Sequence, residues 1–370
     1  MPARSFVPLF CSALAAGACG SSAPLTVASP PASAPSPTVA SAEYEVHEWG
    51  LVRGAADDTQ AFGAIAPPMD FSMMTVDKPV LYFHAPAALT LTSVGVEARS
   101  GGTLIETWPL TPLGTSASWT NVTVDPTGEC TPSPLPSVAE APCSTLAAGT
   151  QCETAALSIV RTDDAACVHV GASTERFLFY RGRATTFTPP LRFERTGAYE
   201  TVRVTNEGDA PIPGMLVRLS SNGFQVRSLV VAPPAPHASI DVHADFDAAI
   251  DHTTADEPRD RRGSDTAPVS VSTGPGRRAL IDTMLEIGLT QSEADAFMRA
   301  WEASLFGPGQ VPIDTLSVDG DPTDRESFVY FLPGAALENV AHLDFDPAPS
   351  GGVHRAIAMW SMLRASGPSH

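Results

Sequence analysis

The chain has 370 residues, of which 43% are hydrophobic and 17% charged, enough to fill one large core or two modest ones. Its 41 acidic residues exceed its 22 Lys and Arg residues and give a formal net charge of -19, which repels a phosphate backbone and argues against nucleic acid as a partner. The 35 prolines and 28 glycines favour many short elements joined by turns, as in β-rich proteins.

Residues 1–18 have the pattern of an export signal. Arg4 precedes the apolar run Phe6–Ala16, which is too short to span a membrane and is followed by small residues. We therefore expect residues 1–18 to be a signal peptide that is removed.

The small residues before Cys19 resemble the lipobox of bacterial lipoproteins, although the family prefers leucine where Ala16 stands, and they also suit ordinary signal peptidase. Residues 19–42 are rich in Ser, Pro and Ala and too poor in large side chains to fold, as expected for a tether. The resemblance implies a lipid anchor on Cys19, and Gly20 in place of aspartate implies the outer membrane. The alternative is a soluble secreted protein without a lipid anchor.

Four later cysteines would then lie in an oxidising compartment, where an even number predicts two disulfides. They are Cys130, Cys143, Cys152 and Cys167. Of the three possible pairings, we favour the short loops, Cys130 with Cys143 and Cys152 with Cys167. A zinc-thiolate site is disfavoured because no spacing matches C-x2-C to C-x4-C.

Residues 43–236 contain strand-like segments at intervals of roughly ten residues, which predicts an antiparallel β-sandwich. Glu175–Gly182 is the densest apolar run, with large side chains on both faces, so we expect a central strand there and Pro79–His84 in the facing layer. The insertion 127–152 interrupts the pattern and holds three of the four cysteines. Ala156–Arg161 resumes the strand pattern.

The C-terminal part contains the one clear helical segment. Residues 237–275 form an acidic surface loop, and residues 276–370 form an αα-hairpin followed by strands. Gly288 ends the first helix, and a capping box of Thr290 and Glu293 opens the second. The predicted fold class is mainly β, an antiparallel β-sandwich with an αα-hairpin and C-terminal strands that either extend the first sheet or build a small lobe.

Several motifs, in order, resemble a group of exported proteins of unknown function from myxobacteria and planctomycetes. They are His47-Glu-Trp-Gly50, Lys78-Pro-Val-Leu-Tyr-Phe83, Arg161-Thr-Asp163 and Glu175-Arg-Phe-Leu-Phe-Tyr-Arg-Gly182. In that group the first motif continues with Thr-Phe-Thr, where this chain has Leu51-Val52-Arg53. The resemblance implies no activity.

The candidate catalytic residues are His47, Asp163 and Glu175. His47 and Glu48 point to opposite faces of a strand and cannot act on one atom, so a buried, hydrogen-bonded histidine is the preferred interpretation. A hydrolase using acids near Asp163 and Glu175 is the alternative function.

The candidate ligand-binding residues are Arg161, Arg181 and Trp49. The arginines could clamp a carboxylate or phosphate, but a strand-end ion pair is preferred, with Asp163 available to Arg181. The chain has no H-E-x-x-H pair, phosphate-binding glycine loop or dinucleotide motif, so no metal and no cofactor are expected. On fold analogy alone, we expect a membrane-anchored binding or scaffold module for a polysaccharide or a protein.

Overall fold

The computed structural model describes residues 41–55, 74–146, 152–184, 186–195, 201–221, 225–243, 249–253, 274–306 and 325–363. Residues Val39–His370 form one compact unit. The expected signal peptide and the expected lipid site Cys19 lie outside the described residues. None of the described helices combines the length and apolarity needed to cross a membrane.

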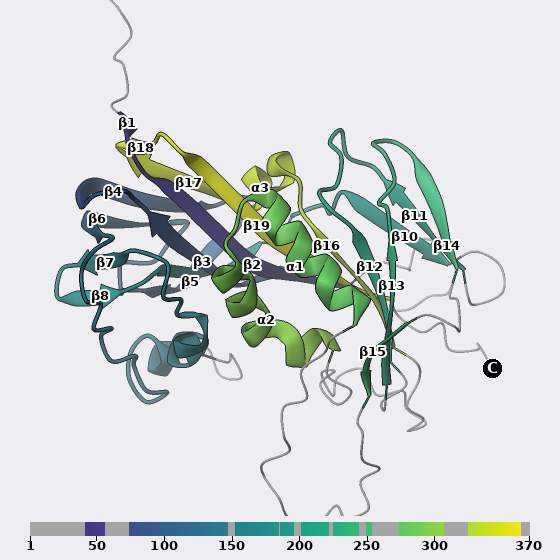
Figure 1. Cartoon of the computed structure of the whole chain (residues 1–370), viewed down its shortest axis with the longest axis horizontal. Coiled ribbons are helices and arrows are strands. Elements are labelled where there is room, and N and C mark those ends of the chain that lie inside the picture. The colour runs from purple at the N-terminus through teal and green to yellow at the C-terminus, as the bar shows by residue number, and fades with distance from the viewer. Residues whose placement is uncertain are drawn as a thin grey trace, which may run out of the picture. The chain divides into compact units, whose positions relative to one another are not determined.

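The largest sheet has nine strands and confirms the prediction of a mainly β fold (Figure 1). In spatial order its strands are β15 (Ala249–Thr253), β13 (Gln225–Val231), β12 (Leu216–Ser221), β16 (Arg325–Phe331), β19 (Gly352–Leu363), β2 (Glu45–Ala55), β3 (Met74–His84), β9 (Leu178–Ala184) and β5 (Thr103–Trp108). All neighbours are antiparallel except β19 and β2, which run parallel at its centre. The first long strand and the last therefore lie side by side.

Smaller sheets complete the β structure. A five-stranded sheet contains β17 (Ala341–Asp346), β4 (Leu89–Ala98), β6 (Ser116–Asp125), β7 (Cys167–Val170) and β8 (Ser173–Glu175). A three-stranded sheet contains β10 (Leu191–Arg195), β11 (Thr201–Asn206) and β14 (Ser239–His243), and β1 (Ser41–Ala42) pairs with β18 (Ala348–Pro349). The end of the predicted tether and part of the predicted acidic loop are thus strands.

The helical hairpin forms as predicted. Helix α1 (Pro275–Ile287) ends at Gly288, whose φ of 115° favours glycine, and α2 (Gln291–Phe306) follows. The backbone N–H of Glu293 donates to the Thr290 hydroxyl at 3.2 Å, and the Thr290 N–H donates to the Glu293 carboxylate at 2.8 Å. These two bonds confirm the capping box. The other helices in the described residues are α3 (Gly334–Val340) and the 3-10 helices η2 (Cys143–Thr145) and η3 (Thr154–Val160).

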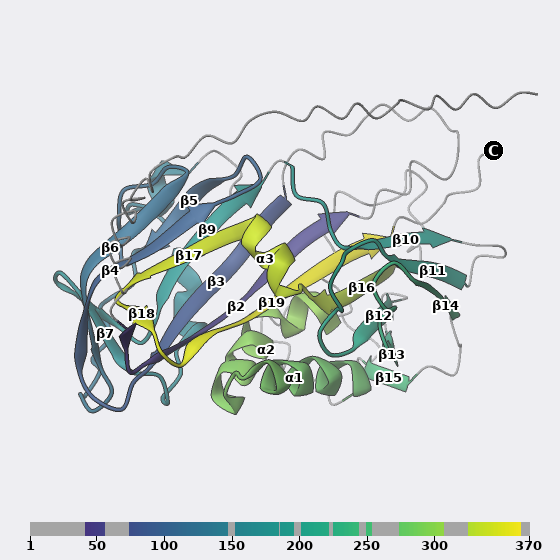
Figure 2. The ribbon, with the colours of Figure 1, turned by 90° about the horizontal axis from the view of Figure 1, so that it is seen from above.

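The nine-stranded sheet is covered on both faces (Figure 2). One face packs on α1, α2 and η3 through side chains such as Trp49, Phe179 and Trp301. The other packs on the smaller sheets through side chains such as Phe83 and Tyr180. Residues of β2 and β9 alternate between the two cores, as their sequence pattern predicts.

Two expectations about placement are wrong, and one open alternative is decided. Strand β9, expected at the centre, lies next to the edge strand β5, and Pro79–His84 is its hydrogen-bonded neighbour rather than a facing layer. Of the two alternatives for the C-terminal strands, extension of the sheet holds, because β16 and β19 belong to the large sheet and β17 to the five-stranded sheet. Thr154–Val160 is a 3-10 helix because Leu157 and Val160, both buried, repeat at a spacing of three.

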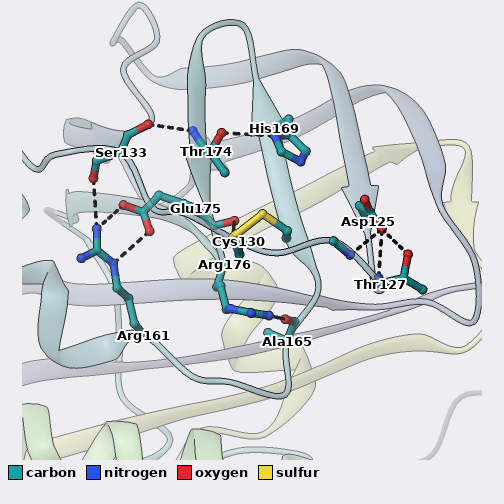
Figure 3. The surroundings of a disulfide bond; sticks show 12 residues. Asp125, Thr127, Cys130, Ser133, Arg161, Ala165, His169, Thr174, Glu175 and Arg176 are labelled. Atoms are coloured by element: carbon teal, nitrogen blue, oxygen red, sulfur yellow. Dashed lines mark hydrogen bonds and ion pairs between the residues drawn. A yellow bond between two sulfur atoms is a disulfide. The ribbon is translucent and has the colours of Figure 1, made fainter.

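Two disulfides form from the four cysteines expected to be oxidised, consistent with an extracytoplasmic protein. The expected short-loop pairing is wrong, because Cys130 bonds to Cys167 and Cys143 bonds to Cys152. Figure 3 shows Cys130 beside the hairpin of β7 and β8, where Ser133 also bonds to Thr174. The start of the insertion is thus attached to the five-stranded sheet.

We expect the two disulfides to differ in their contribution to stability. Cys130–Cys167 closes a loop with a sequence separation of 37, and Cys143–Cys152 one with a separation of 9. Loop-closure entropy gives about 4 kcal/mol for the first and about 2.5 kcal/mol for the second. Urea unfolding of the Cys130→Ala/Cys167→Ala and Cys143→Ala/Cys152→Ala variants measures both losses. A larger loss from the second pair would contradict the loop-length argument.

Candidate metal centre

Three adjacent strands of the large sheet each place a histidine on the helix-covered face. His354 of β19 and His47 of β2 are paired directly, and His84 of β3 lies opposite Glu45. Glu45 precedes His47 by two residues, so both side chains point to the same face. The ring centroids of His47 and His84 are 4.3 Å apart, and those of His47 and His354 are 5.2 Å apart.

Helix α2 adds a carboxylate to this cluster from above the sheet. Glu293 is fully buried, and its Oε2 lies 2.8 Å from His47 Nδ1 while its Oε1 lies 2.8 Å from His84 Nε2. The capping bond from Thr290 N–H fixes the same carboxylate at the first turn of the helix. The helix start therefore sets the position of an acid that contacts two imidazoles.

The charge of Glu293 follows from these donors. Burial raises the pKa of its carboxyl, but the hydrogen bonds from His47, His84 and the Thr290 N–H outweigh burial and hold the pKa at about 2. Burial lowers the pKa of His84, yet the hydrogen bond and charge of Glu293 outweigh it and raise that pKa above its usual value. Glu293 is thus a carboxylate at neutral pH and can only accept hydrogen bonds.

This fixes the proton positions on two of the rings. His47 Nδ1 must carry the proton donated to Glu293, so the neutral form of the ring has its lone pair on Nε2. His354 Nδ1 lies 3.0 Å from the carbonyl oxygen of Ile287, which also only accepts, so its lone pair is likewise on Nε2. In both rings Nδ1 donates to an acceptor, which fixes the orientation of the ring and leaves Nε2 available to a ligand.

Both Nε2 atoms lie near the Glu45 carboxylate. His47 Nε2 lies 3.6 Å from Glu45 Oε1, and His354 Nε2 lies 3.8 Å from Glu45 Oε2. One ligand atom from each of Glu45, His47 and His354 lies within 4.8 Å of the other two. His47 Nε2 is buried and makes no hydrogen bond with any described residue. Two nitrogens and a carboxylate surround a point that a cation could occupy.

In a second trio, formed by His47, His84 and Glu293, the ligand atoms also lie within 4.8 Å of one another. Its donor atoms already lie 2.8 Å apart as hydrogen bonds, however, and Glu293 also accepts the Thr290 N–H. In the first trio the nitrogens have no such partner. We therefore assign the ligand role to Glu45, His47 and His354 and a supporting role to Glu293.

Gly288, in the turn between α1 and α2, packs against the His354 ring. A Cβ added to Gly288 would lie 2.5 Å from His354 Nδ1. Gly288 is therefore required both by its positive φ and by the imidazole packed against it.

No protein-family model and no curated protein matches this chain. The assignment of a site therefore rests on its geometry.

The other predicted site residues do not belong to the histidine cluster and have other partners. Glu175 forms an ion pair with Arg161 through both carboxylate oxygens (Figure 3). It also accepts the Trp108 indole N–H at 3.3 Å. Asp163 is exposed at a turn, and the buried Trp49 ring packs edge-on against Phe297 at 5.6 Å. Within the described part of the chain, His47, Asp163 and Glu175 thus have different neighbours, and no hydrogen bond joins them as a catalytic set.

The expected partner of Arg181 is also corrected. Its Nη1 donates to Glu106 at 2.8 Å, not to Asp163. Glu106, which has no exposed surface, accepts further bonds from the backbone N–H groups of Glu153 and Thr154 at the start of η3. The Glu106 carboxylate thus attaches the start of η3, directly after the disulfide-containing insertion, to the large sheet.

His47 was predicted to point away from Glu48, and the structure confirms this. Glu48 points to the other core, where it accepts hydrogen bonds from Tyr180 and Arg355. The signal that would have found the ligand set is Glu45-x-His47, since residues two apart share a strand face. Glu293 was recognised only as a helix cap.

Proposed function

We propose that this protein is an exported metalloprotein that binds one Zn²⁺ ion through a Glu45 oxygen, His47 Nε2 and His354 Nε2. The observation that carries the proposal is His47 Nε2, a buried ring nitrogen with no hydrogen-bond partner among the described residues that faces a carboxylate and a second imidazole nitrogen. Leaving such a group without a partner costs free energy, and a cation bound there removes that cost.

The donor set favours zinc. Two imidazoles and one carboxylate form a familiar zinc ligand set, and zinc undergoes no redox change in an oxidising compartment. Each ligating histidine in zinc sites donates its other N–H to a carboxylate or a backbone carbonyl, which fixes the ring. Here Glu293 supports His47 and the Ile287 carbonyl supports His354.

The location is part of the same proposal. Removal of residues 1–18 and lipid attachment to Cys19 would place the folded part on the outer membrane behind the tether of residues 19–42, and the two disulfides support an extracytoplasmic location. The metal centre makes this a metal-binding module. A polysaccharide or protein ligand would be a further partner of that module.

The test is the metal content of the mature chain. Chelator-treated protein dialysed against Zn²⁺ should take up one ion per chain, measured by mass spectrometry of the metal. The Glu45→Gln/His354→Ala variant should retain none, and His84→Ala should retain one, because the hydrogen bond of His84 within the described residues goes to Glu293 and not to the ligand set.

His342→Ala is the matched control, because it removes a histidine that bonds to Glu338 at 2.7 Å outside the cluster. It should also retain one ion. Loss of zinc in His84→Ala with retention in the Glu45 and His354 variant would overturn the assigned ligand set.

A further inference from the structure

We infer that the bound ion keeps a coordination position open to solvent, where water or a small monoanionic oxygen or nitrogen donor such as a carboxylate or azide binds reversibly. This inference rests on the proposed function. It distinguishes a zinc site of the catalytic type, with three protein ligands and an exchangeable fourth, from a closed structural site.

The described residues supply three ligand atoms and no fourth. Zinc is usually tetrahedral, so a structural site would need one more protein donor. His84 is the further histidine of the cluster, and its Nε2 is bonded to Glu293 Oε1 at 2.8 Å. Glu293 is itself occupied by His47, His84 and the Thr290 N–H. Among the residues that the structure describes, the fourth position is left to a ligand from solution.

The burial of the ligands gives the direction of the open position. The His47 side chain is 3% exposed and lies beneath helix α2, whereas His354 and Glu45 are 34% and 42% exposed. An ion held between them is shielded on the His47 side and accessible on the Glu45 and His354 side. A ligand can therefore exchange without displacing helix α2.

The surrounding charges select the class of ligand. Glu45 neutralises one charge of the ion directly, and the buried Glu293 carboxylate behind His47 offsets the other. Water, hydroxide or a monoanion is compatible with this field, whereas a phosphate dianion is repelled.

Cobalt substitution tests the open position without requiring an enzymatic assay. The mature protein is loaded with Co²⁺, which replaces zinc and absorbs visible light, and is then titrated with azide, acetate and phosphate. We expect a saturable change of the visible spectrum with azide and acetate, and at least about tenfold weaker binding of phosphate from the charge argument. His342→Ala should give the same titrations.

The outcomes separate the two proposals. Stoichiometric Co²⁺ binding with a spectrum unchanged by azide and acetate would overturn the open position and leave the metal site standing. Failure to bind one Co²⁺ per chain would overturn the metal site itself. Equal or tighter binding of phosphate would contradict the inferred ligand class.

Discussion

Replacing Glu106 with alanine should destabilise the folded protein by about 3–5 kcal/mol, because it removes the charged acceptor of a buried guanidinium. Glu106 has no exposed surface, and Arg181 Nη1 lies 2.8 Å from its Oε2. Its Oε1 also accepts the N–H groups of Glu153 and Thr154 and the hydroxyl of Thr154. The substitution removes all of these acceptors at once.

The matched control is an ion pair of the same length at the surface. Glu97 and Arg99 also lie 2.8 Å apart, but both are more than 40% exposed. Glu97→Ala should cost less than about 1 kcal/mol because water screens the pair. Urea unfolding measures both variants, and equal losses would show that burial does not set the cost of the substitution.

A double replacement tests whether removing both charges of the buried ion pair costs less stability than removing one. Glu106→Leu with Arg181→Met removes both charges and leaves neither group unpaired, so it should recover part of the loss caused by Glu106→Ala. The backbone N–H groups at the start of η3 still lose their acceptor, so recovery should be incomplete.

The second large effect is expected at His47. Structural zinc sites with four ligands have apparent binding free energies of about 10–16 kcal/mol, so one ligand is worth about 2.5–4 kcal/mol. His47→Ala should therefore weaken zinc binding about 10²- to 10³-fold. Competition with a chromophoric chelator measures the dissociation constant, and circular dichroism in chelator checks that the variant folds.

A graded series distinguishes a ligand from the residue that orients it. Glu293→Gln retains one acceptor oxygen but loses the charge facing His47, and such supporting residues change metal affinity about 10- to 100-fold. Glu286→Gln removes the same charge from an exposed position on α1 and should leave the affinity unchanged. If Glu293→Gln behaved like Glu286→Gln, the carboxylate would have no part in positioning His47.

Local features of the fold could be predicted from single segments. The alternation of His47, Trp49 and Leu51 with Val46 predicts which core each side chain enters, because alternation is a property of any extended backbone. The hairpin boundaries were equally readable from Gly288 and the capping box. Both signals lie within a few residues of the structure they specify.

The candidate site was only partly predictable for the same reason. His47 was identified, but Glu45 and His354 carry no recognisable motif, and Glu293 has a sufficient local explanation as a helix cap. The disulfides show the same limit, since loop length favoured Cys130–Cys143 whereas the pairing of β6 with β7 places Cys167 within reach of Cys130.

By itself the sequence determined the β-rich class, the strand faces, the helical hairpin and the cysteines that form disulfides, because each depends on composition or on the stereochemistry of neighbouring residues. Tertiary structure decided that β19 runs parallel to β2 and that Glu293, 246 residues after His47, contacts it. Strand order is set by which apolar faces bury one another across the whole chain. That long-range choice, and no local motif, brings the three histidines and two carboxylates together.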